Sequence, residues 1–331
     1  MIPRKVKADL IEVTDDLLDY LLKEDPYVKI ADSLRMLLGE QWFKYQEDAL
    51  VETIEFLDNG KGILNDKDVK ELLVMLENKM QIDLNMHISN IVNSKQLEAY
   101  QRAYRDNKVK FSYTNTNKET LEWMHDFETY WIGKFNKEQI TEVLGKRLNE
   151  LVLEVNAQGM GRTDAGNYFK NELKTFFSTP EKFTGTTQQY YEGLATNIIT
   201  RARAFANVDS YVDSGIEYYK VVAVNDSRTS KICRHMHGRI IPVQMAVEYK
   251  DKLTSIKDPE EVKSKFGWLK TKDTEKLKNM KDKDLPLGLA LPPYHFNCRT
   301  TTVLANSNEI NEFEATLEKW YSPLVKKFLP S

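Results

Sequence analysis

The residues best suited to chemistry are both cysteines and three of the five histidines of the chain, which gather between positions 233 and 298. They form two groups, Cys233-x-His235-x-His237 and His295-x-x-Cys298. Zinc prefers thiolate sulfur and imidazole nitrogen as ligands, and four of them complete a tetrahedral site. The cluster therefore offers five candidate ligands for a structural zinc ion, which would stabilise a small module.

Other interpretations of this cluster stay open. Free cysteine is often buried as a small hydrophobic residue, so the group could be a hydrogen-bonded part of the core without a metal. The two thiols could instead form a disulfide or take part in catalysis. Because the chain has only two cysteines, it lacks a disulfide framework, which favours synthesis in a reducing cytoplasm.

The spacing of the candidate ligands predicts how they are presented. We expect the segment around Cys233, His235 and His237 to be a strand, because alternate side chains of a strand point to one face. His295 and Cys298 are spaced as in a turn. A strand and a turn would together bring the two groups to one side of a small fold.

Polar residues flank both cysteines. Arg228 can pair with a carboxylate through two hydrogen bonds. Asp226 and Thr229 can accept backbone N–H groups and so hold a turn. Arg299 lies next to Cys298 and could donate to buried carbonyls. We interpret these residues as a structural hydrogen-bonded group and not as catalytic residues.

The elements that position these residues change in character near residue 215. Before it, apolar residues recur at helical spacing; after it, short runs of strand-forming residues appear. We therefore predict an α+β chain, in which a mainly helical body precedes a small α+β module with short strands and a helical tail. Helices are expected over 10–22, 69–80, 81–105, 136–158, 163–176, 187–213 and 308–328, and strands over 218–224, 239–243 and the end of the loop 291–303.

The same change divides the chain into regions. We expect a helical N-terminal region over 1–135, a helical part leading into the module over 136–215, the α+β module over 216–305 and a helical tail over 306–331. Within the module, a lysine-rich insertion over 250–284 has Phe266, Trp268 and Leu269 as its apolar anchors. Acidic residues alternate with its lysines, so we expect a solvated face, although lysines beside aromatic rings can also grip DNA.

The composition limits the class of protein. Of 331 residues, 41% are hydrophobic and 29% charged, which is enough to bury a core and remain soluble. The net charge of −3 gives no overall attraction to nucleic acid. No stretch reaches the roughly 18 apolar residues of a membrane span, and the charged start Met1–Asp9 does not look like a signal peptide. We expect no membrane partner.

Two blocks of this sequence resemble the phage Mu F-like head-morphogenesis family. The family's first block, Asp-x-Arg-Thr-Cys-x-x-Cys before a turn with Asp-Gly or His-Gly, is similar to residues 224–238, which end in His237-Gly238. Its second block, Pro-Pro-x-His-x-Asn-Cys-Arg-Cys, is similar to residues 292–300. Ser230 and Thr300 stand where the family often has a cysteine. The likeness in detail covers 187–303, and the first 186 residues share only helical character.

The resemblance implies a minor head protein of a tailed phage that acts in head morphogenesis and is not an enzyme. It implies a place in the host cytoplasm during assembly and then in the virion, inside the capsid near the portal vertex. The implied partners are the portal protein, the major capsid protein or both, with a role in phage DNA packaging, retention or delivery. The residues of the structural motif are Asp226, Arg228, Thr229, Gly238, Pro292, Pro293, Asn297 and Arg299.

Two other functions stay open. A metal-dependent nuclease or toxin-like enzyme would need a metal with an open coordination position and a nearby general base, for which Asp226 and Glu248 are the candidates. A DNA-binding module would use the lysines of the insertion. Salt-dependent DNA binding without cleavage would distinguish the second from the first.

Overall fold

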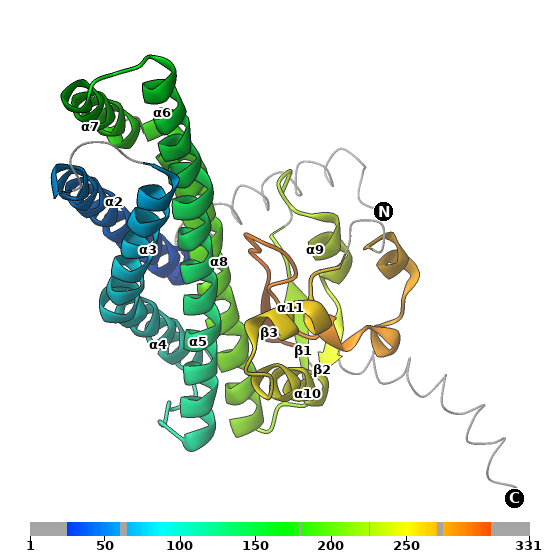
Figure 1. Cartoon of the computed structure of the whole chain (residues 1–331). Helices are drawn as coiled ribbons and strands as arrows, with labels where there is room; N and C mark the ends of the chain where they lie inside the picture. The colour runs from blue at the N-terminus through cyan, green and yellow to red at the C-terminus, as the bar shows by residue number, and fades with distance from the viewer. Residues whose placement is uncertain (1–24, 60–64, 179, 225, 270–273, 306–331) are drawn as a thin grey trace, which may run out of the picture. The chain divides into compact units, whose positions relative to one another are not determined.

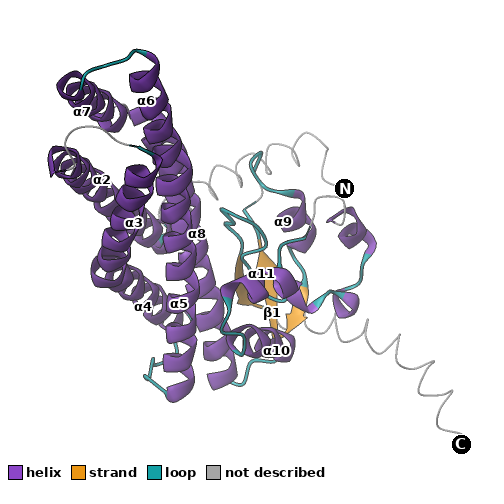
Figure 2. Ribbon diagram, in the orientation of Figure 1, coloured by secondary structure: helices purple, strands orange, loops and turns teal. Residues whose placement is uncertain are grey.

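The computed structural model describes residues 25–59, 65–178, 180–224, 226–269 and 274–305. Its contacts divide the chain into two compact units. The described residues of the first unit fall in Met1–Ile30, Leu97–Leu121 and Thr196–Ser331, and those of the second in Ala31–Gln96 and Glu122–Ala195. Helices dominate, and one small sheet belongs to the first unit (Figures 1 and 2). The predicted fold class, a mainly helical body with a small α+β module, is confirmed.

The second unit is built from helices whose apolar residues form its core. Helix bounds are α2 Pro26–Asn59, α3 Asp66–Asp83, α4 Ser89–Asp106, α5 Asn115–Glu138, α6 Gly145–Ala157, α7 Arg162–Ser178 and α8 Pro180–Asp213, and the division between the units falls within α2, α4, α5 and α8. On α3, the predicted face is buried at Val69, Leu72, Leu76 and Met80. Helical spacing thus identified a real packing face, because buried side chains must recur with the turn of the helix.

Two short π-helical turns join consecutive helices in this unit, η1 Leu84–Ile88 and η2 Gln139–Leu144. The single helix expected over 136–158 is therefore wrong in detail. Its first residues belong to α5, and η2 leads from there into α6. A π turn contains an extra residue, which the regular spacing of apolar residues in the sequence does not reveal.

Asn65 caps the start of α3. Its Oδ1 atom accepts the backbone N–H groups of Lys67 at 2.9 Å and Asp68 at 3.1 Å. Asp68 in turn accepts the N–H of Asn65 at 3.0 Å. This reciprocal pair satisfies helix N–H groups that have no partner within the helix.

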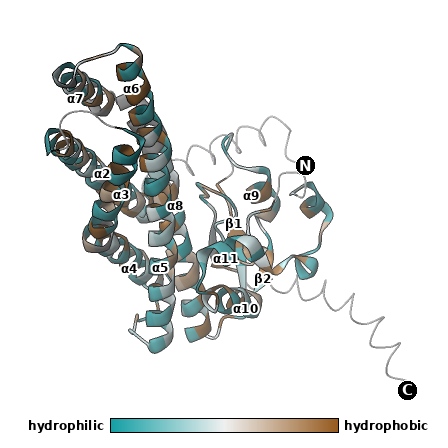
Figure 3. Ribbon diagram, in the orientation of Figure 1, coloured by the Kyte–Doolittle hydropathy of each residue, from teal (hydrophilic) through white to brown (hydrophobic). Residues whose placement is uncertain are grey.

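Pro26 stands at the first position of α2. A proline is suited to the first turn of a helix, where its missing N–H is not needed. The helices expected over 10–22 and 306–331 lie outside the described residues. None of the helices that the structure describes is long and apolar enough to cross a membrane, and Figure 3 shows hydrophobic and hydrophilic residues mixed along them.

The sheet of the first unit has three antiparallel strands in the order β2-β1-β3. The strands are β1 Tyr218–Val222, β2 Ile240–Pro242 and β3 Thr301–Leu304, close to the three expected segments. In the register, Tyr219 pairs with Ile241 and Val221 pairs with Thr302. Tyr219 and Val221 are buried while their neighbours on β1 are less so, so one face of the sheet meets the core.

Helix α8 holds this sheet through its last turns. Tyr211 stacks on Tyr219 with ring centroids 5.9 Å apart. The Asn207 amide donates to the Thr302 hydroxyl at 3.1 Å. The helix thus contacts both β1 and β3, and it fixes the position of the chain that enters β3.

Two further segments of the first unit contact α8 by hydrogen bonds. On α4, the Tyr104 hydroxyl donates to Asp213 at 3.1 Å. The Asn107 amide, just after α4, donates to Ser210 at 2.7 Å. Residue 215, where a boundary was expected, lies just after α8. This position is inside the first unit, which also includes residues 97–121.

The charged insertion is anchored by one of the expected residues and by others that were not expected. It contains the end of α10 Val243–Thr254, α11 Pro259–Phe266 and the 3-10 turns η3 Glu275–Asn279 and η4 Asp282–Asp284, with η5 Leu287–Leu289 following. Phe266 is half-buried and packs edge-on against Tyr249 of α10, with ring centroids 5.6 Å apart. Trp268 is 49% exposed, whereas the aliphatic residues Leu253, Val262 and Leu277 are buried and are further anchors.

Arg239 ties the insertion to the rest of the module. Its guanidinium donates to the backbone carbonyls of Leu277 at 2.5 Å and Met280 at 2.8 Å, and to the carboxylate of Asp282 at 2.5 Å. The same side chain donates to the carbonyl of His235 at 2.8 Å. The side chain of Arg239 consequently ties η3 and η4 of the insertion to the module.

Candidate metal centre

Cys233, His295 and Cys298 form a close cluster in the first unit. The Cys233 Sγ atom lies 3.1 Å from His295 Nε2 and 3.7 Å from Cys298 Sγ. All three ligand atoms lie within 4.8 Å of one another. Both cysteines are buried and free, and His295 is half-buried. The two sequence blocks that contain these residues therefore meet in space.

Cys233 is held by the short helix α9 Lys231–Met236. The hydroxyl of Ser230, at its N-cap, accepts the backbone N–H of Cys233 at 3.4 Å. After the helix, Gly238 has a φ of +81°, a conformation that glycine adopts without steric cost, and the chain turns into β2. The strand expected around residues 233–237 is therefore wrong.

Helix α9 and its end remove His235 and His237 from the candidate ligands. Successive helix residues are turned by about 100°, so His235, two residues after Cys233, points to nearly the opposite side, and His237 follows the helix as its C-cap residue with a non-helical ψ of 130°. His235 is half-buried, and His237 is exposed and accepts the N–H of Ala223 at Nδ1 over 3.1 Å. Neither belongs to the cluster of ligand atoms. Three of the five predicted ligands are brought together, and two are not.

His295 and Cys298 lie on the loop between η5 and β3. Asn297 between them has a φ of +61°, and asparagine tolerates this left-handed conformation better than most residues. The Pro292–Pro293 peptide bond that precedes them is cis. The turn at Asn297 allows the side chains of His295 and Cys298 to converge on Cys233.

Helix α8 positions the backbone of Cys298. The N–H of Cys298 donates to Asn197 Oδ1 at 3.3 Å, and its carbonyl accepts the hydroxyl of Thr200 at 3.0 Å. The sequence analysis missed Asn197 and Thr200. Their signal was present, because two polar residues three apart occur on a helix face that is otherwise apolar.

The hydrogen bonds of His295 prepare its second nitrogen to bind a metal. Nδ1 lies 2.7 Å from the carbonyl of Phe296, so in the neutral ring this nitrogen carries the hydrogen and donates it. Nε2, which faces Cys233, then presents its lone pair. Metal-bound histidines commonly donate their other N–H to a carbonyl in this way.

The three groups also shift one another's pKa values. The thiol of Cys233 donates a hydrogen bond to Cys298 and, with His295, holds the pKa of Cys298 well below its usual range. The same contact raises the pKa of Cys233, and Cys298 raises the pKa of His295. Cys298 is therefore the thiol that loses its proton first, and thiolate is the form that binds a metal.

The distances can be compared with those of a zinc site. Zinc–sulfur bonds of about 2.3 Å at tetrahedral angles place two sulfurs about 3.8 Å apart, and the two cysteine sulfurs are 3.7 Å apart. The corresponding sulfur–nitrogen separation is about 3.5 Å, slightly longer than the 3.1 Å between Cys233 and His295. The three residues thus lie close enough together to bind a metal ion, and their spacing is compatible with zinc.

Two hydroxyls complete the surroundings of Cys233. Ser230 and Thr300 both make side-chain hydrogen bonds to it, which act to lower its pKa. Beside them lies a small pocket of about 20 Å³ that is bordered by Cys233 and His295. The other lining residues are Val224, Arg228, Thr229, Asn297 and Arg299. The pocket gives the cluster an opening on one side.

Asp226 organises the turn before α9. Its carboxylate accepts hydrogen bonds from Arg299 at 2.7 Å, from the Thr229 hydroxyl at 2.9 Å and from the N–H of Arg228 at 3.0 Å. These bonds, led by that of Arg299, hold the pKa of Asp226 well below its usual range. Arg299 thus pairs with Asp226 and not with backbone carbonyls, while the Arg228 side chain is 77% exposed and 3.6 Å from the carboxylate.

Replacing Asp226 with asparagine is expected to lower the free energy of unfolding at pH 7 by about 1–2 kcal/mol, because Arg299 loses a charged partner at a partly exposed site. The folded-state pKa of Asp226 is depressed. Its contribution is therefore complete above the unfolded-state pKa of about 3.9 and is lost as the pH falls toward the folded-state pKa.

Urea unfolding of the wild type and the variant at pH 7 and at low pH measures this difference. We expect it to shrink below about pH 4. Arg299→Gln should cause a similar loss, whereas Arg228→Gln should change little because that side chain is exposed. Equal stability of the Asp226 variant and the wild type at pH 7 would contradict the importance of this contact.

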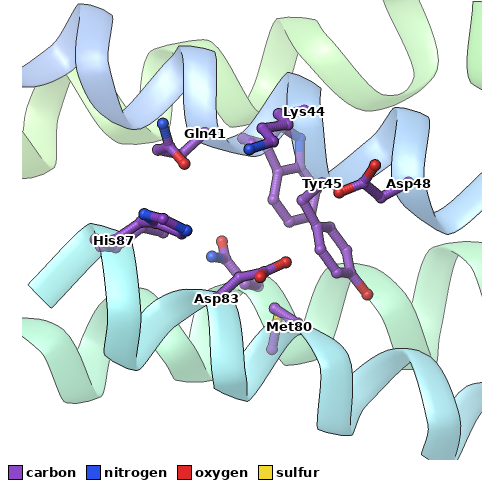
Figure 4. A pocket seen from close by; sticks show the side chains of 10 residues that line it. Gln41, Lys44, Tyr45, Asp48, Met80, Asp83 and His87 are labelled. Atoms are coloured by element: carbon purple, nitrogen blue, oxygen red, sulfur yellow. The ribbon is translucent and has the colours of Figure 1, made fainter.

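The second unit has a pocket of its own, shown in Figure 4. It lies between side chains of α2, α3 and η1, with a volume of about 50 Å³. Its labelled lining residues are Gln41, Lys44, Tyr45, Asp48, Met80, Asp83 and His87. This space suits about one or two water molecules, and it is far smaller than the several hundred Å³ of a typical ligand site.

No family of proteins, curated protein or solved structure matches this chain in comparisons with known proteins.

Proposed function

We propose that this chain is a minor head protein of a tailed phage, similar to the Mu F-like head-morphogenesis proteins, and that it assists capsid assembly and not catalysis. One observation carries the proposal. The two sequence blocks that resemble this family contact each other twice in the fold, through Cys233 with His295 and Cys298, and through Asp226 with Arg299 at 2.7 Å. Residues 62 positions apart in sequence, Cys233 and His295, thus bring the two blocks together.

In this proposal the cluster binds one zinc ion through Cys233, His295 and Cys298. The ion joins α9 to the loop before β3, and Asn197 of α8 bonds the backbone of Cys298. A metal at this point holds together two segments that are distant in sequence, α9 and the loop before β3. It therefore stabilises a module whose sheet has only three short strands.

The surroundings of the cluster favour a structural role over a nuclease. Of the two bases considered from the sequence, Asp226 is bound to Arg299. Glu248 lies on α10, is exposed and pairs with Lys252 at 2.7 Å. Neither carboxylate belongs to the group of ligand atoms in the described part of the chain. A water-activating site would need such a base within hydrogen-bond reach.

The helices of the second unit offer surfaces for the proposed partners. On α2, the side chains of Met36, Phe43 and Val51 are each more than half exposed, at 57%, 53% and 55%. Exposed apolar side chains of this size suit contacts with another protein. The portal protein and the major capsid protein are the proposed partners, and the chain assists packaging, retention or delivery of DNA.

Association with phage heads tests the assembly role. A tagged copy of the full chain is produced in cells in which the phage heads assemble, and the particles are separated on a density gradient. We expect the chain to sediment with procapsids or filled heads in few copies per particle, as quantified by mass spectrometry. A chain that stays at the top of the gradient contradicts the proposal. Plasmid cleavage that needs added metal and is lost in His295→Ala would favour the nuclease.

Metal content tests the zinc site. The full chain is purified without chelator under reducing conditions, and its metals are quantified by mass spectrometry. We expect about one zinc ion per chain, which is lost in Cys298→Ser. His237→Ala is the matched control and should keep the ion, because His237 lies outside the cluster. A wild-type chain without metal, even after incubation with zinc, contradicts the site.

A further inference from the structure

We infer that the site formed by Cys233, His295 and Cys298 is open, and that its fourth coordination position takes a small exchangeable anion from outside the chain. The inference rests on the zinc binding proposed above and adds what the metal can do. A closed site with four protein ligands is only structural, whereas three protein ligands leave a position for an external ligand.

The described part of the chain offers no usual fourth ligand. Both cysteines of the chain are already used. Of its five histidines, only His295 belongs to the group of ligand atoms, and no described carboxylate joins that group. Zinc takes four ligands, so within the described part of the chain the fourth position is left to a hydroxyl of a neighbouring residue or to a molecule from outside.

The neighbouring hydroxyls are poor candidates. Ser230 and Thr300 hydrogen-bond to the sulfur of Cys233, as groups around a metal do when they orient its ligand. Neutral hydroxyls are not among the usual zinc ligands, which are thiolate, imidazole and carboxylate. Their position is nevertheless useful, because a cysteine at either residue would place a third sulfur beside Cys233.

The pocket identifies the open side. It borders Cys233 and His295, and its volume of about 20 Å³ is enough for about one water molecule or a similar small group. A ligand that enters here lies beside two of the three metal-binding residues. In the proposed site, the fourth ligand would approach the metal from this pocket.

The charges around the pocket favour an anion. Zinc bound to two thiolates and a neutral imidazole has no net charge. The guanidinium groups of Arg228 and Arg299 line the pocket, and Asp226 offsets only one of them. One positive charge remains, and asparagine 297 adds a polar but neutral side chain. A small anion gains more from this surplus than a neutral ligand does.

Cobalt(II) provides the test, because its visible absorption bands respond to the ligands of a tetrahedral site. The full chain is loaded with cobalt(II) under reducing conditions and titrated with azide. We expect the bands to shift in a saturable way in the wild type. Cobalt that binds with bands unchanged by azide overturns the open site but leaves the metal site intact. A chain that binds neither cobalt nor zinc overturns both.

Variants of the neighbouring hydroxyls sharpen the test. Thr300→Cys and Ser230→Cys each supply a third sulfur as a fourth ligand, so at least one should still bind cobalt and lose the azide response. Thr300→Val and Ser230→Ala remove a hydroxyl without adding a ligand, and both should keep the response. In one outcome, azide leaves the cobalt bands of the wild type unchanged but shifts those of Thr300→Val or Ser230→Ala. The hydroxyl removed in that variant would then be the fourth ligand, and the inference would be overturned.

Discussion

Replacing Lys250 with methionine is expected to lower the free energy of unfolding by about 3–5 kcal/mol. Lys250 of α10 is 3% exposed, and its ammonium contacts the carboxylate of Asp209 on α8, which is 8% exposed. The hydroxyl of Tyr100 on α4 donates to the same carboxylate. Without Lys250, Asp209 is a buried charge with no opposite charge, and the cost of its lost hydration is no longer offset.

Urea unfolding of the full chain at pH 7 measures this effect, and two variants control it. Lys252→Met removes an exposed lysine that pairs with Glu248 on the same helix, so the loss should stay under about 1 kcal/mol. Adding Asp209→Asn to Lys250→Met removes the stranded charge and keeps an acceptor for Tyr100. It should recover much of the stability. If the single variant unfolds at the same urea concentration as the wild type, Lys250 does not form the buried pair.

Removing the metal of the proposed site is expected to lower the free energy of unfolding by a similar amount. A ligand that binds only the folded chain adds about 4 kcal/mol to the free energy of unfolding when its free concentration is about a thousand times its dissociation constant. The zinc of the proposed site would contribute in this way, because its ligands come from α9 and from the loop before β3 and are separated when the chain unfolds. Chelation should therefore lower the melting temperature of the zinc-loaded protein.

Thermal unfolding with zinc or with a chelator, in reducing buffer, makes the comparison. The wild type should melt at a lower temperature with the chelator, and Cys298→Ser should melt at the same temperature in both. His235→Ala should behave as the wild type, because this residue is outside the cluster. Identical melting of the wild type in the two buffers would show that the cluster is held by its hydrogen bonds alone.

Part of this architecture follows from the sequence alone. The helical face of α3 and the strands near Tyr218, Ile240 and Thr301 were predictable, since each depends on a pattern within a short stretch of chain. The sequence also identified Cys233 and Cys298 as candidate metal ligands, because thiolate sulfur is one of the few side-chain groups that zinc prefers. A local pattern predicts a helix or strand reliably where a single periodicity of apolar residues dominates. Any other arrangement would then bury polar side chains, which costs free energy.

Only the tertiary structure decided which residues share the site. Residues 231–236 are too few for spacing to distinguish a strand from a helix. The helix that forms there turns His235 away from Cys233, and His237 lies beyond the end of that helix. The contact of Lys250 with Asp209 likewise joins residues 41 positions apart. Such partners depend on how whole elements pack, because the free energy of a buried charge or a metal ligand is set by neighbours in space and not in sequence.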